Sequence, residues 1–380
     1  MPDPSPQSDS PQPGESVDDG KGRIFPCERC GADLEFHIGQ QDMKCPYCGF
    51  EKTIEVAHDV VIAEQDFHAM LDKVREWHEQ ADGAQETGQS EVRCVGCGGN
   101  VVFVGPLTSS ECPYCGSPIQ RDKVHDSPKR IPVHGVLPFH VEKEQARLNL
   151  SDWVRSRWFA PKEFLQRGVE GRFNGVYLPF WTYDSMTFSL YWGERGDHYW
   201  VTVTINNQTQ QQQRTRWTSV SGNYQRFFDD VLVLGTKGMQ PDLMQELEPW
   251  PLEQIQPFTQ ELLAGFLART YEVELDEGFK VARTRIDSAI ASDVRGLIGG
   301  DEQRISDIKT RYDAITFKHL LLPVWLLAYR HREKTYQVLV NAVTGEVQGE
   351  RPYSAWKIFF AVLLGLVLVG GSIYLHQNAR

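Results

Sequence analysis

Residues 173–205 read FNGVYLPFWTYDSMTFSLYWGERGDHYWVTVTI, a run dominated by aromatic and β-branched residues. Such residues fit the pleated, half-buried surface of a sheet, so the run predicts β-structure. Gly193 and Gly196 interrupt it, and we expect a turn between two strands there. The polar stretch NNQTQQQQR that follows, residues 206–214, is expected to form a hairpin tip or a loop.

A Leu-Pro pattern recurs around this run, at residues 137–139 (LPF), 178–181 (LPFW) and 322–325 (LPVW). The second and third copies each lead into aromatic strands broken by a charged turn, GERGD or HREK. We interpret this as a duplicated antiparallel β element with helices packed on one side. A proline inside such a run indicates an edge strand or a kink at strand entry. Chance recurrence of the pattern is the alternative.

Helical periodicity appears on both sides of the β-rich run. Phe67, Met70, Leu71, Val74 and Trp77 form one apolar stripe, which predicts an amphipathic helix. Further expected elements are helices near 142–158, 241–248, 257–270 and 276–298, then strands over 303–350 with a hairpin bend at Thr344-Gly345. Residues 131–351 are therefore predicted to form an α+β domain.

All eight cysteines belong to two copies of the frame C-x2-C-x14-C-x2-C. Two-residue spacing lets both thiolates of one turn point at one ion, and the longer excursion lets a hairpin bring the second pair across. Four thiolates leave no open coordination position, so we predict two structural Zn²⁺ ions. The ligands are Cys27, Cys30, Cys45 and Cys48 in the first frame, and Cys94, Cys97, Cys112 and Cys115 in the second.

A glycine directly follows the second cysteine of every pair, at Gly31, Gly49, Gly98 and Gly116. Glycine supplies the unusual backbone angle with which a knuckle points its amides at sulfur. The rival interpretation is redox chemistry, because CPYC at Cys45 and Cys112 also occurs in glutaredoxin-type oxidoreductases. Such a motif is expected at a strand-to-helix junction. Here each CPYC ends a short module with a partner pair upstream, which favours zinc.

No other sequence motif indicates a catalytic reaction. The chain has no GxxxxGK[ST], GxSxG or GxGxxG motif. Asp301-Glu302-Gln303-Arg304 faintly resembles a helicase box, but without a phosphate loop it is better explained as a cap or turn after Gly299-Gly300. Asp184, Asp229 and Asp230 offer carboxylates for acid–base work, yet adjacent residues on a strand point to opposite faces. We therefore predict a non-enzymatic protein.

The two ends of the chain differ sharply. Residues 1–22 are rich in proline and acids and lack a signal peptide, so a disordered tail is expected. Residues 358–375, IFFAVLLGLVLVGGSIYL, carry no formal charge and would span roughly 27 Å as a helix. With Trp356 and Tyr374 as interface residues, they predict a transmembrane helix over 356–376. A buried core helix is the alternative.

Net charge bears on the partners. Lys+Arg minus Asp+Glu is 39 − 51 = −12. A net anion is a poor candidate for nucleic-acid binding, which needs clustered cations to release phosphate counterions. A nucleic-acid-binding ribbon protein held at the membrane is nevertheless kept as the alternative function. Reduced cysteines favour a cytoplasmic body, so the predicted location is the bacterial inner membrane, with a single-pass C-terminal anchor.

These inferences combine into a multidomain chain with two small β zinc ribbons, an α+β domain and one transmembrane helix. Its predicted divisions are a tail (1–22), zinc ribbon 1 (23–57), an amphipathic helix and linker (58–91), zinc ribbon 2 (92–122), the α+β domain (131–351) and the transmembrane helix (356–376).

The chain resembles a bacterial family of membrane-anchored zinc-ribbon proteins, described as TFIIB-type or "primosomal protein N′-like". The matching stretches are CERCGADLEF…CPYCG, GVLPFHV, GVYLPFWTYDS, YWGERGDHY, IGGDEQR, TFKHLLLPVWLLAYR and VNAVTGEVQGERPYS, between residues 23 and 376. The likeness to the primosomal helicase stops at the cysteine pairs. The resemblance implies an adaptor or scaffold that presents protein-interaction modules in membrane-stress or membrane-remodelling assemblies, beside PspA-like or SPFH-type partners.

Overall fold

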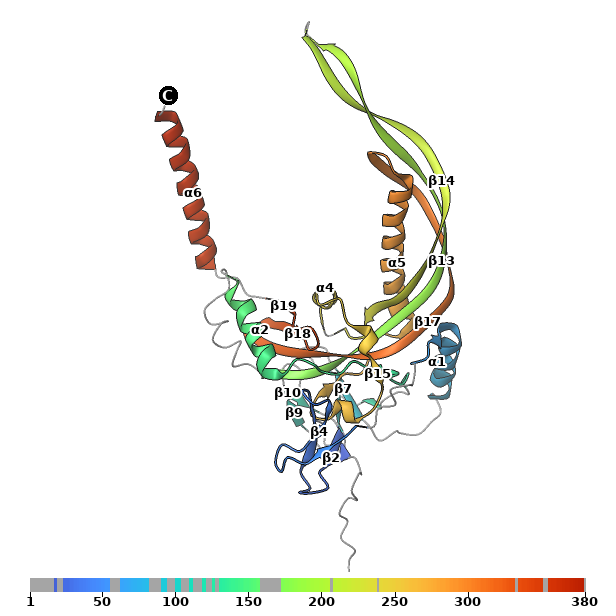
Figure 1. Ribbon diagram of the computed structural model, residues 1–380, viewed down its shortest axis with the longest axis vertical. Coiled ribbons are helices and arrows are strands. Elements are labelled where there is room, and N and C mark those ends of the chain that lie inside the picture. Colours follow the sequence, from blue (N-terminus) through green and yellow to red (C-terminus); the bar gives the residue numbers. More distant parts are fainter. Residues whose placement is uncertain are drawn as a thin grey trace, which may run out of the picture.

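The computed structural model describes most of the chain (Figure 1). The described residues are 17–18, 23–54, 62–81, 90–93, 100–103, 109–111, 118–120, 125–126, 130–157, 172–205, 208–237, 239–331, 334–350 and 355–378. The predicted tail over 1–22 therefore lies almost entirely outside them.

One strand runs through the centre of the structure. β13 (Arg172–Ile205) pairs antiparallel with β14 (Gln208–Leu234) on one side and with β17 (Glu302–His331) on the other. At roughly 3.3 Å per residue, its 34 residues have a contour length on the order of 110 Å. The three strands rise together as one tall, curved and twisted sheet (Figure 1).

Short strands complete this nine-stranded sheet at its lower end. The sheet order is β14-β13-β17-β12-β15, with the remaining strands paired alongside. The short strands are β6 (Gln65–Asp66), β12 (Gly135–Val136), β15 (Gln256–Pro257), β16 (Leu267–Ala268), β18 (Lys334–Asn341) and β19 (Val347–Gly349).

The turn expected at Gly193 and Gly196 is absent from β13, which continues through both residues. A Cβ at Gly193 would lie 2.4 Å from the carbonyl oxygen of Arg304 on β17, and one at Gly196 would lie 2.9 Å from the ring of Trp217. These glycines therefore permit close approach of neighbouring strands rather than a change of direction.

The hairpin expected at the polar stretch 206–214 is confirmed by the antiparallel pairing of β13 with β14, but its non-strand extent was predicted too long, because β14 already begins at Gln208. Gln208 pairs with Ile205, and Gln210 to Gln213 continue the register opposite β13. Glutamine and threonine side chains give little apolar signal, but the backbone groups that form the ladder are the same in every residue.

Two of the Leu-Pro motifs lie opposite each other in the sheet, since Pro179 pairs with Leu321 and Leu178 with Leu322. Of the two predicted alternatives, the edge strand is wrong, because β13 and β17 are both interior strands. The Pro179 carbonyl accepts the Gly235 amide on the β14 side, just beyond the last β13–β14 pair, Phe180 with Leu234. The missing proline N–H therefore falls where the ladder has already ended.

The helices pack individually against the sheet and do not form a continuous helical layer. α1 (Phe67–Ala81) and α5 (Leu275–Ile298) carry the predicted stripes, and α2 (Lys143–Arg155) matches the helix expected near 142–158. α5 lies along the tall sheet (Figure 1), where Ile286, Ile290 and Val294 are buried. The only part of the 241–248 prediction that is α-helical is α4 (Pro241–Gln245).

The helix predicted over 257–270 is wrong. That segment contains the end of β15, a 3-10 turn η3 (Glu261–Leu263), a left-handed residue Gly265 with φ +82° and then β16. Another 3-10 turn, η2 (Leu252–Gln254), precedes it. The described chain is thus mostly β with a few helices, and the α+β assignment is corrected accordingly.

The hairpin expected at Thr344-Gly345 is confirmed. β18 and β19 pair antiparallel, and Gly345 has φ +80° and donates its amide to the Asn341 carbonyl. Glycine meets no steric penalty at positive φ, so it closes the turn.

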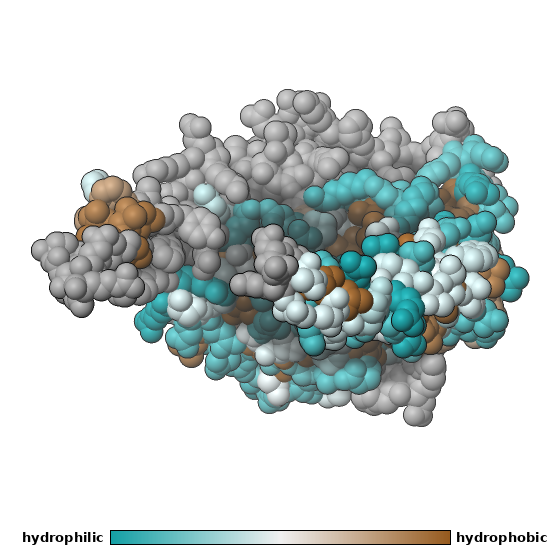
Figure 2. All heavy atoms as spheres, turned by 90° about the horizontal axis from the view of Figure 1, so that it is seen from above, coloured by the Kyte–Doolittle hydropathy of each residue, from teal (hydrophilic) through white to brown (hydrophobic). Residues whose placement is uncertain are grey.

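The predicted transmembrane helix over 356–376 and the membrane location derived from it are not supported. No helix among the described residues is both long and apolar enough to cross a bilayer. α6 (Ala355–Asn378) covers this region. Its described apolar side chains form the brown patch at the left of Figure 2.

Two glycines of α5 test the packing of this helix on the sheet. A Cβ at Gly278 would lie 2.4 Å from the hydroxyl oxygen of Tyr183, which itself donates to the Leu275 carbonyl, whereas a Cβ at Gly296 meets nothing within 4 Å. We expect Gly296→Ala to stabilise the protein by about 0.5–1 kcal/mol through helix propensity. Gly278→Ala should instead destabilise it by about 1–3 kcal/mol through overpacking. Urea unfolding of both variants measures this, and equal stabilisation by both would contradict the packing described.

Candidate metal centre

The first cysteine frame lies in a small five-stranded sheet. Its strands are β1 (Val17–Asp18), β2 (Arg23–Pro26), β3 (Asp33–His37), β4 (Asp42–Lys44) and β5 (Glu51–Lys52), each paired with the next. Leu34 and Phe36 alternate inward on β3, and Met43 is fully buried on β4. The hairpin between the two cysteine pairs is therefore formed by β3 and β4, as the fourteen-residue spacing predicts.

Both cysteine pairs form matching turns. The Gly31 amide donates to the Cys27 carbonyl at 2.8 Å, and the Gly49 amide donates to the Cys45 carbonyl at 3.0 Å. Gly31 has φ +72° and Gly49 has φ +70°, the left-handed conformation that glycine adopts without strain. This confirms the role predicted for these two glycines.

The turns bring the four sulfur atoms together. The Sγ atoms of Cys27 and Cys48 are 3.6 Å apart, those of Cys30 and Cys45 are 3.5 Å apart, and all four lie within 4.8 Å of one another. A tetrahedral ion with bonds of about 2.3 Å to sulfur requires sulfur–sulfur distances of about 3.8 Å. The cysteines are free thiols rather than disulfides. This cluster can therefore hold a metal ion.

The electrostatics of the cluster also favour a cation. The amides of Cys48 and Tyr47 help lower the pKa of the Cys45 thiol to about 7. At Cys30 the Ala32 amide acts to lower the pKa, but hydrogen bonds with Cys45 and Cys48 outweigh it and raise the value to about 12. Crowded thiols thus resist losing all their protons unless a positive ion compensates the charge.

The context expected for a redox CPYC is not found at Cys45 and Cys48. The turn that contains them joins β4 to β5, whereas the redox interpretation requires a helix after the motif. Cys45 and Cys27 are also almost fully buried, at 1% and 3% exposure.

The second cysteine frame lies outside the described residues. This applies to Cys94, Cys97, Cys112 and Cys115, and to Gly98 and Gly116. The strands described around it are β7 (Ser90–Arg93), β8 (Asn100–Phe103), β9 (Ser109–Glu111), β10 (Pro118–Gln120) and β11 (His125–Asp126).

The first ribbon is docked on the large sheet, a feature that the sequence analysis missed. The Phe36 amide donates to the Ala264 carbonyl at 3.1 Å, and Gln41 donates through Nε2 to the Phe139 carbonyl at 2.8 Å. Phe36 also packs against Phe266, and Ala264 joins the apolar cluster beneath the cysteines. Alternating Leu34, Phe36 and Ile38 were the available signal that one ribbon face is apolar.

A second acidic group was only partly anticipated. Carboxylate oxygens of Glu64, Asp184 and Asp230 lie within 4.8 Å of one another. Lys318 pairs with two of these carboxylates, with Nζ 2.5 Å from Glu64 and 2.8 Å from Asp230. Burial lowers the pKa of Lys318, but these two carboxylates outweigh that effect and raise it. An internal ammonium ion already pairs with two of the three carboxylates, so we do not assign the cluster a metal.

The cluster forms at an irregularity in the sheet. The β13–β14 register shifts between Tyr183 and Ser185, and Asp230 has φ +48°. This bulge turns Asp230 toward Asp184, whose carboxylate accepts the Asp230 amide at 2.6 Å. Of the adjacent aspartates Asp229 and Asp230, only Asp230 joins Asp184 in the cluster, and Asp229 is exposed.

The cap or turn predicted for Asp301-Glu302-Gln303-Arg304 holds only for Asp301, because β17 already begins at Glu302. α5 ends at Ile298, Gly299 and Gly300 have φ +66° and +80°, and the Asp301 amide donates to the Gly196 carbonyl on β13.

Comparison with known proteins gives one informative relative. The chain is similar to the uncharacterized protein YdjG of Bacillus subtilis (strain 168), with 24% identity over 369 residues, covering 91% of this chain and 98% of that protein. No protein-family description matches the chain. No solved structure matches it either.

Metal removal should loosen the docked ribbon. Without the ion, the four thiols no longer hold the two turns together, and the Phe36–Ala264 hydrogen bond should open. Hydrogen exchange after chelation is expected to accelerate at the Phe36 amide while amides in the β13–β17 ladder keep their protection. Unchanged protection at Phe36 in demonstrably metal-free protein would contradict this dependence.

Asp184 gives a pH prediction. Burial raises its pKa to about 6, helped by Glu64 and Asp230 and opposed by the Asp230 amide. Between an unfolded value of about 3.9 and that value, the native state binds more protons than the unfolded state, so the unfolding free energy falls as pH rises. Asp184→Asn should remove this component of the pH dependence. Urea unfolding between pH 4 and 7 measures it, with Asp313→Asn as control, which alters a partly exposed carboxyl on β17 that pairs with Arg311. Parallel curves for wild type and Asp184→Asn would refute the assignment.

Proposed function

We propose that this protein is a non-enzymatic scaffold for protein–protein interaction, in which a structural zinc ion orders the N-terminal ribbon and thereby fixes it to a long β-sheet. The observation that carries the proposal is the docking of the ribbon. Its apolar face is occupied by Ala264 and Phe266, so the ribbon is held in one orientation with its cysteine turns facing outward.

Zinc is the ion that suits this donor set best. The cluster offers four thiolates, a soft and tetrahedral arrangement typical of zinc or iron–sulfur sites. Four protein ligands complete the shell of a zinc ion, so no position is left for a substrate or a reactive water. By the identity of the cysteine frames, we propose a second structural zinc at Cys94, Cys97, Cys112 and Cys115.

The exposed end of the ribbon offers a contact surface. Tyr47 lies between the cysteines of the second turn and is 81% exposed. Exposed aromatic residues on a rigid support are frequent anchors of protein interfaces, because they lose little conformational entropy on binding. The ribbon adjoins the sheet near the start of β13, far from the tip of the strand (Figure 1). Such separation suits a scaffold that presents different surfaces to different partners.

The resemblance to bacterial zinc-ribbon proteins supports the same role. It also suggests which partners to test first, namely PspA-like and SPFH-type proteins.

Elemental analysis and affinity purification together test the proposal. We expect two zinc ions per full-length chain and one in the Cys27→Ser/Cys45→Ser variant. Purification from the native host should recover defined partners, and Tyr47→Ala should deplete at least one of them by about tenfold, a loss of about 1.4 kcal/mol in binding. Leu148→Ala, which alters an exposed apolar residue on α2, is the matched control. A zinc-free chain, or an identical set of partners with every variant, would contradict the proposal.

A further inference from the structure

Near its upper end the tall sheet narrows from three strands to two, because β17 does not extend as far as β13 and β14. β17 begins at Glu302, which pairs with Gly196, whereas β13 continues to Ile205 with β14 still opposite it. Beyond Gly196, no described strand pairs with this side of β13. Residues 197–205 and 208–216 thus form a two-stranded ribbon that projects past α5 (Figure 1). An isolated two-stranded ribbon is at best marginally stable in water.

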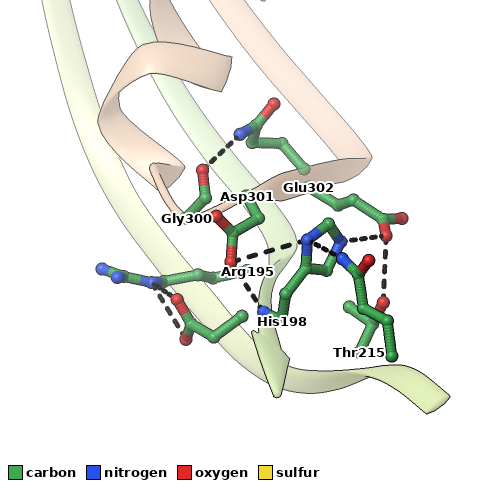
Figure 3. Close-up of polar contacts among 9 residues, drawn as sticks. Arg195, His198, Thr215, Gly300, Asp301 and Glu302 are labelled. Carbon is green, nitrogen blue, oxygen red and sulfur yellow. Dashed lines mark hydrogen bonds and ion pairs between the residues drawn. The ribbon is translucent and has the colours of Figure 1, made fainter. Parts of the chain in front are cut away.

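A polar cluster lies at the last pair of the β13–β17 ladder, Gly196 with Glu302 (Figure 3). The Asp301 amide donates to the Gly196 carbonyl at 2.9 Å, and the Asp301 carboxylate accepts the His198 amide at 2.6 Å. Glu302 holds the His198 ring at 2.7 Å and also accepts the Thr215 hydroxyl at 2.9 Å. The last backbone groups of β13 beside β17 are therefore capped by the backbone amide and the side chain of Asp301.

These contacts reveal which backbone groups face the open edge. Gly196 and His198 direct their carbonyl and amide toward the β17 side, and the direction alternates along an antiparallel strand. The β13–β14 register is regular from Ser185 to Ile205. The amides and carbonyls of Trp200, Thr202 and Thr204 therefore point outward on that edge, while those of Val201 and Val203 bond to β14.

The open edge lacks the features that protect edge strands. Residues 199–205 read YWVTVTI, without charge, proline or glycine. Trp200 is 64% exposed. Natural sheets protect exposed edges with charges, prolines or bulges, because an unprotected edge pairs readily with another strand. The opposite edge of the ribbon, QTQQQQRTR on β14, is instead polar and carries Arg214 and Arg216.

We propose that two copies of this chain associate through the open β13 edge at residues 200–204, forming a four-stranded antiparallel sheet. In the symmetric register that starts beyond the capped His198, Thr202 lies opposite Thr202 and Trp200 lies opposite Thr204. Val201 then faces Val203. The edge is neutral, so two copies meet without charge repulsion, and β-branched residues face one another across the junction.

A second copy fits this edge better than an unrelated charged strand does. A two-fold axis through Thr202 uses every outward amide and carbonyl of Trp200, Thr202 and Thr204 on both chains. It places Asp301 and His198 of each copy outside the paired segment, where their hydrogen bond is kept. The partner strand then takes the position beside β13 that β17 occupies lower in the sheet.

Matched proline variants test which edge associates. In Thr202→Pro the lost amide is one that faces outward, so the β13–β14 hairpin keeps its internal ladder. Gln211→Pro alters the residue directly opposite on β14, whose amide faces the other edge. Sedimentation equilibrium of the full-length protein should show a dimer for wild type and for Gln211→Pro, and a dimer Kd raised at least about tenfold for Thr202→Pro. Unchanged far-UV circular dichroism and metal content confirm that each variant is folded.

A charge-reversal pair tests the register. Thr202→Lys and Thr202→Glu should each weaken association, because like charges face each other across the two-fold axis. Mixing the two variants should restore a heterodimer in which Lys faces Glu. A monomeric wild type at high concentration, loss of the dimer in Gln211→Pro alone, or no recovery on mixing would overturn the proposal. These results would leave the zinc scaffold untouched, since the ribbon is not part of this contact.

Discussion

The double pairing of β13 is the constraint on which the rest of the structure depends. Its backbone is hydrogen-bonded to β14 and β17 along most of its length, and α5 packs across the same three strands. A strand bonded on both edges must pack its side chains within the spacing of the sheet. Glycine at 193 and 196 meets this demand where neighbouring atoms leave no room for a Cβ, and proline at 179 is tolerated where the β13–β14 ladder ends. Residues that usually end strands are thus explained by their neighbours in the sheet.

The fold was predictable where a local pattern coincided with a packed surface. The stripes of α1 and α5 are apolar at helical spacing, and both helices were anticipated because each buries that stripe against the sheet. Gly345 marked its hairpin because positive φ is a local requirement. The polar residues 208–214 and the segment 257–270 were not predictable, because their conformations follow from pairing with distant residues. The C-terminal run was read as a membrane span, which the described residues do not support.

The cysteine cluster could be predicted from the cysteine spacing because the two turns and the hairpin between them are contiguous in sequence. The positive φ angles of its glycines could be predicted for the same reason. The docking of the ribbon was not, since Phe36 and Ala264 are more than two hundred residues apart and neither carries a distinctive motif. The Lys318 cluster also depends on distant residues, because Glu64, Asp184, Asp230 and Lys318 come from four separate parts of the chain.

Residue-resolved hydrogen exchange along β13, at concentrations too low for association, tests the central claim most directly. Between Ser185 and Arg195 the strand is paired on both sides, so amides of odd and even residues should both be protected. Beyond His198 only the amides that face β14, those of Tyr199, Val201 and Val203, should remain slow, while Trp200, Thr202 and Thr204 exchange quickly. Uniform exchange across both sets, or rapid exchange throughout 185–195, would contradict the doubly paired strand.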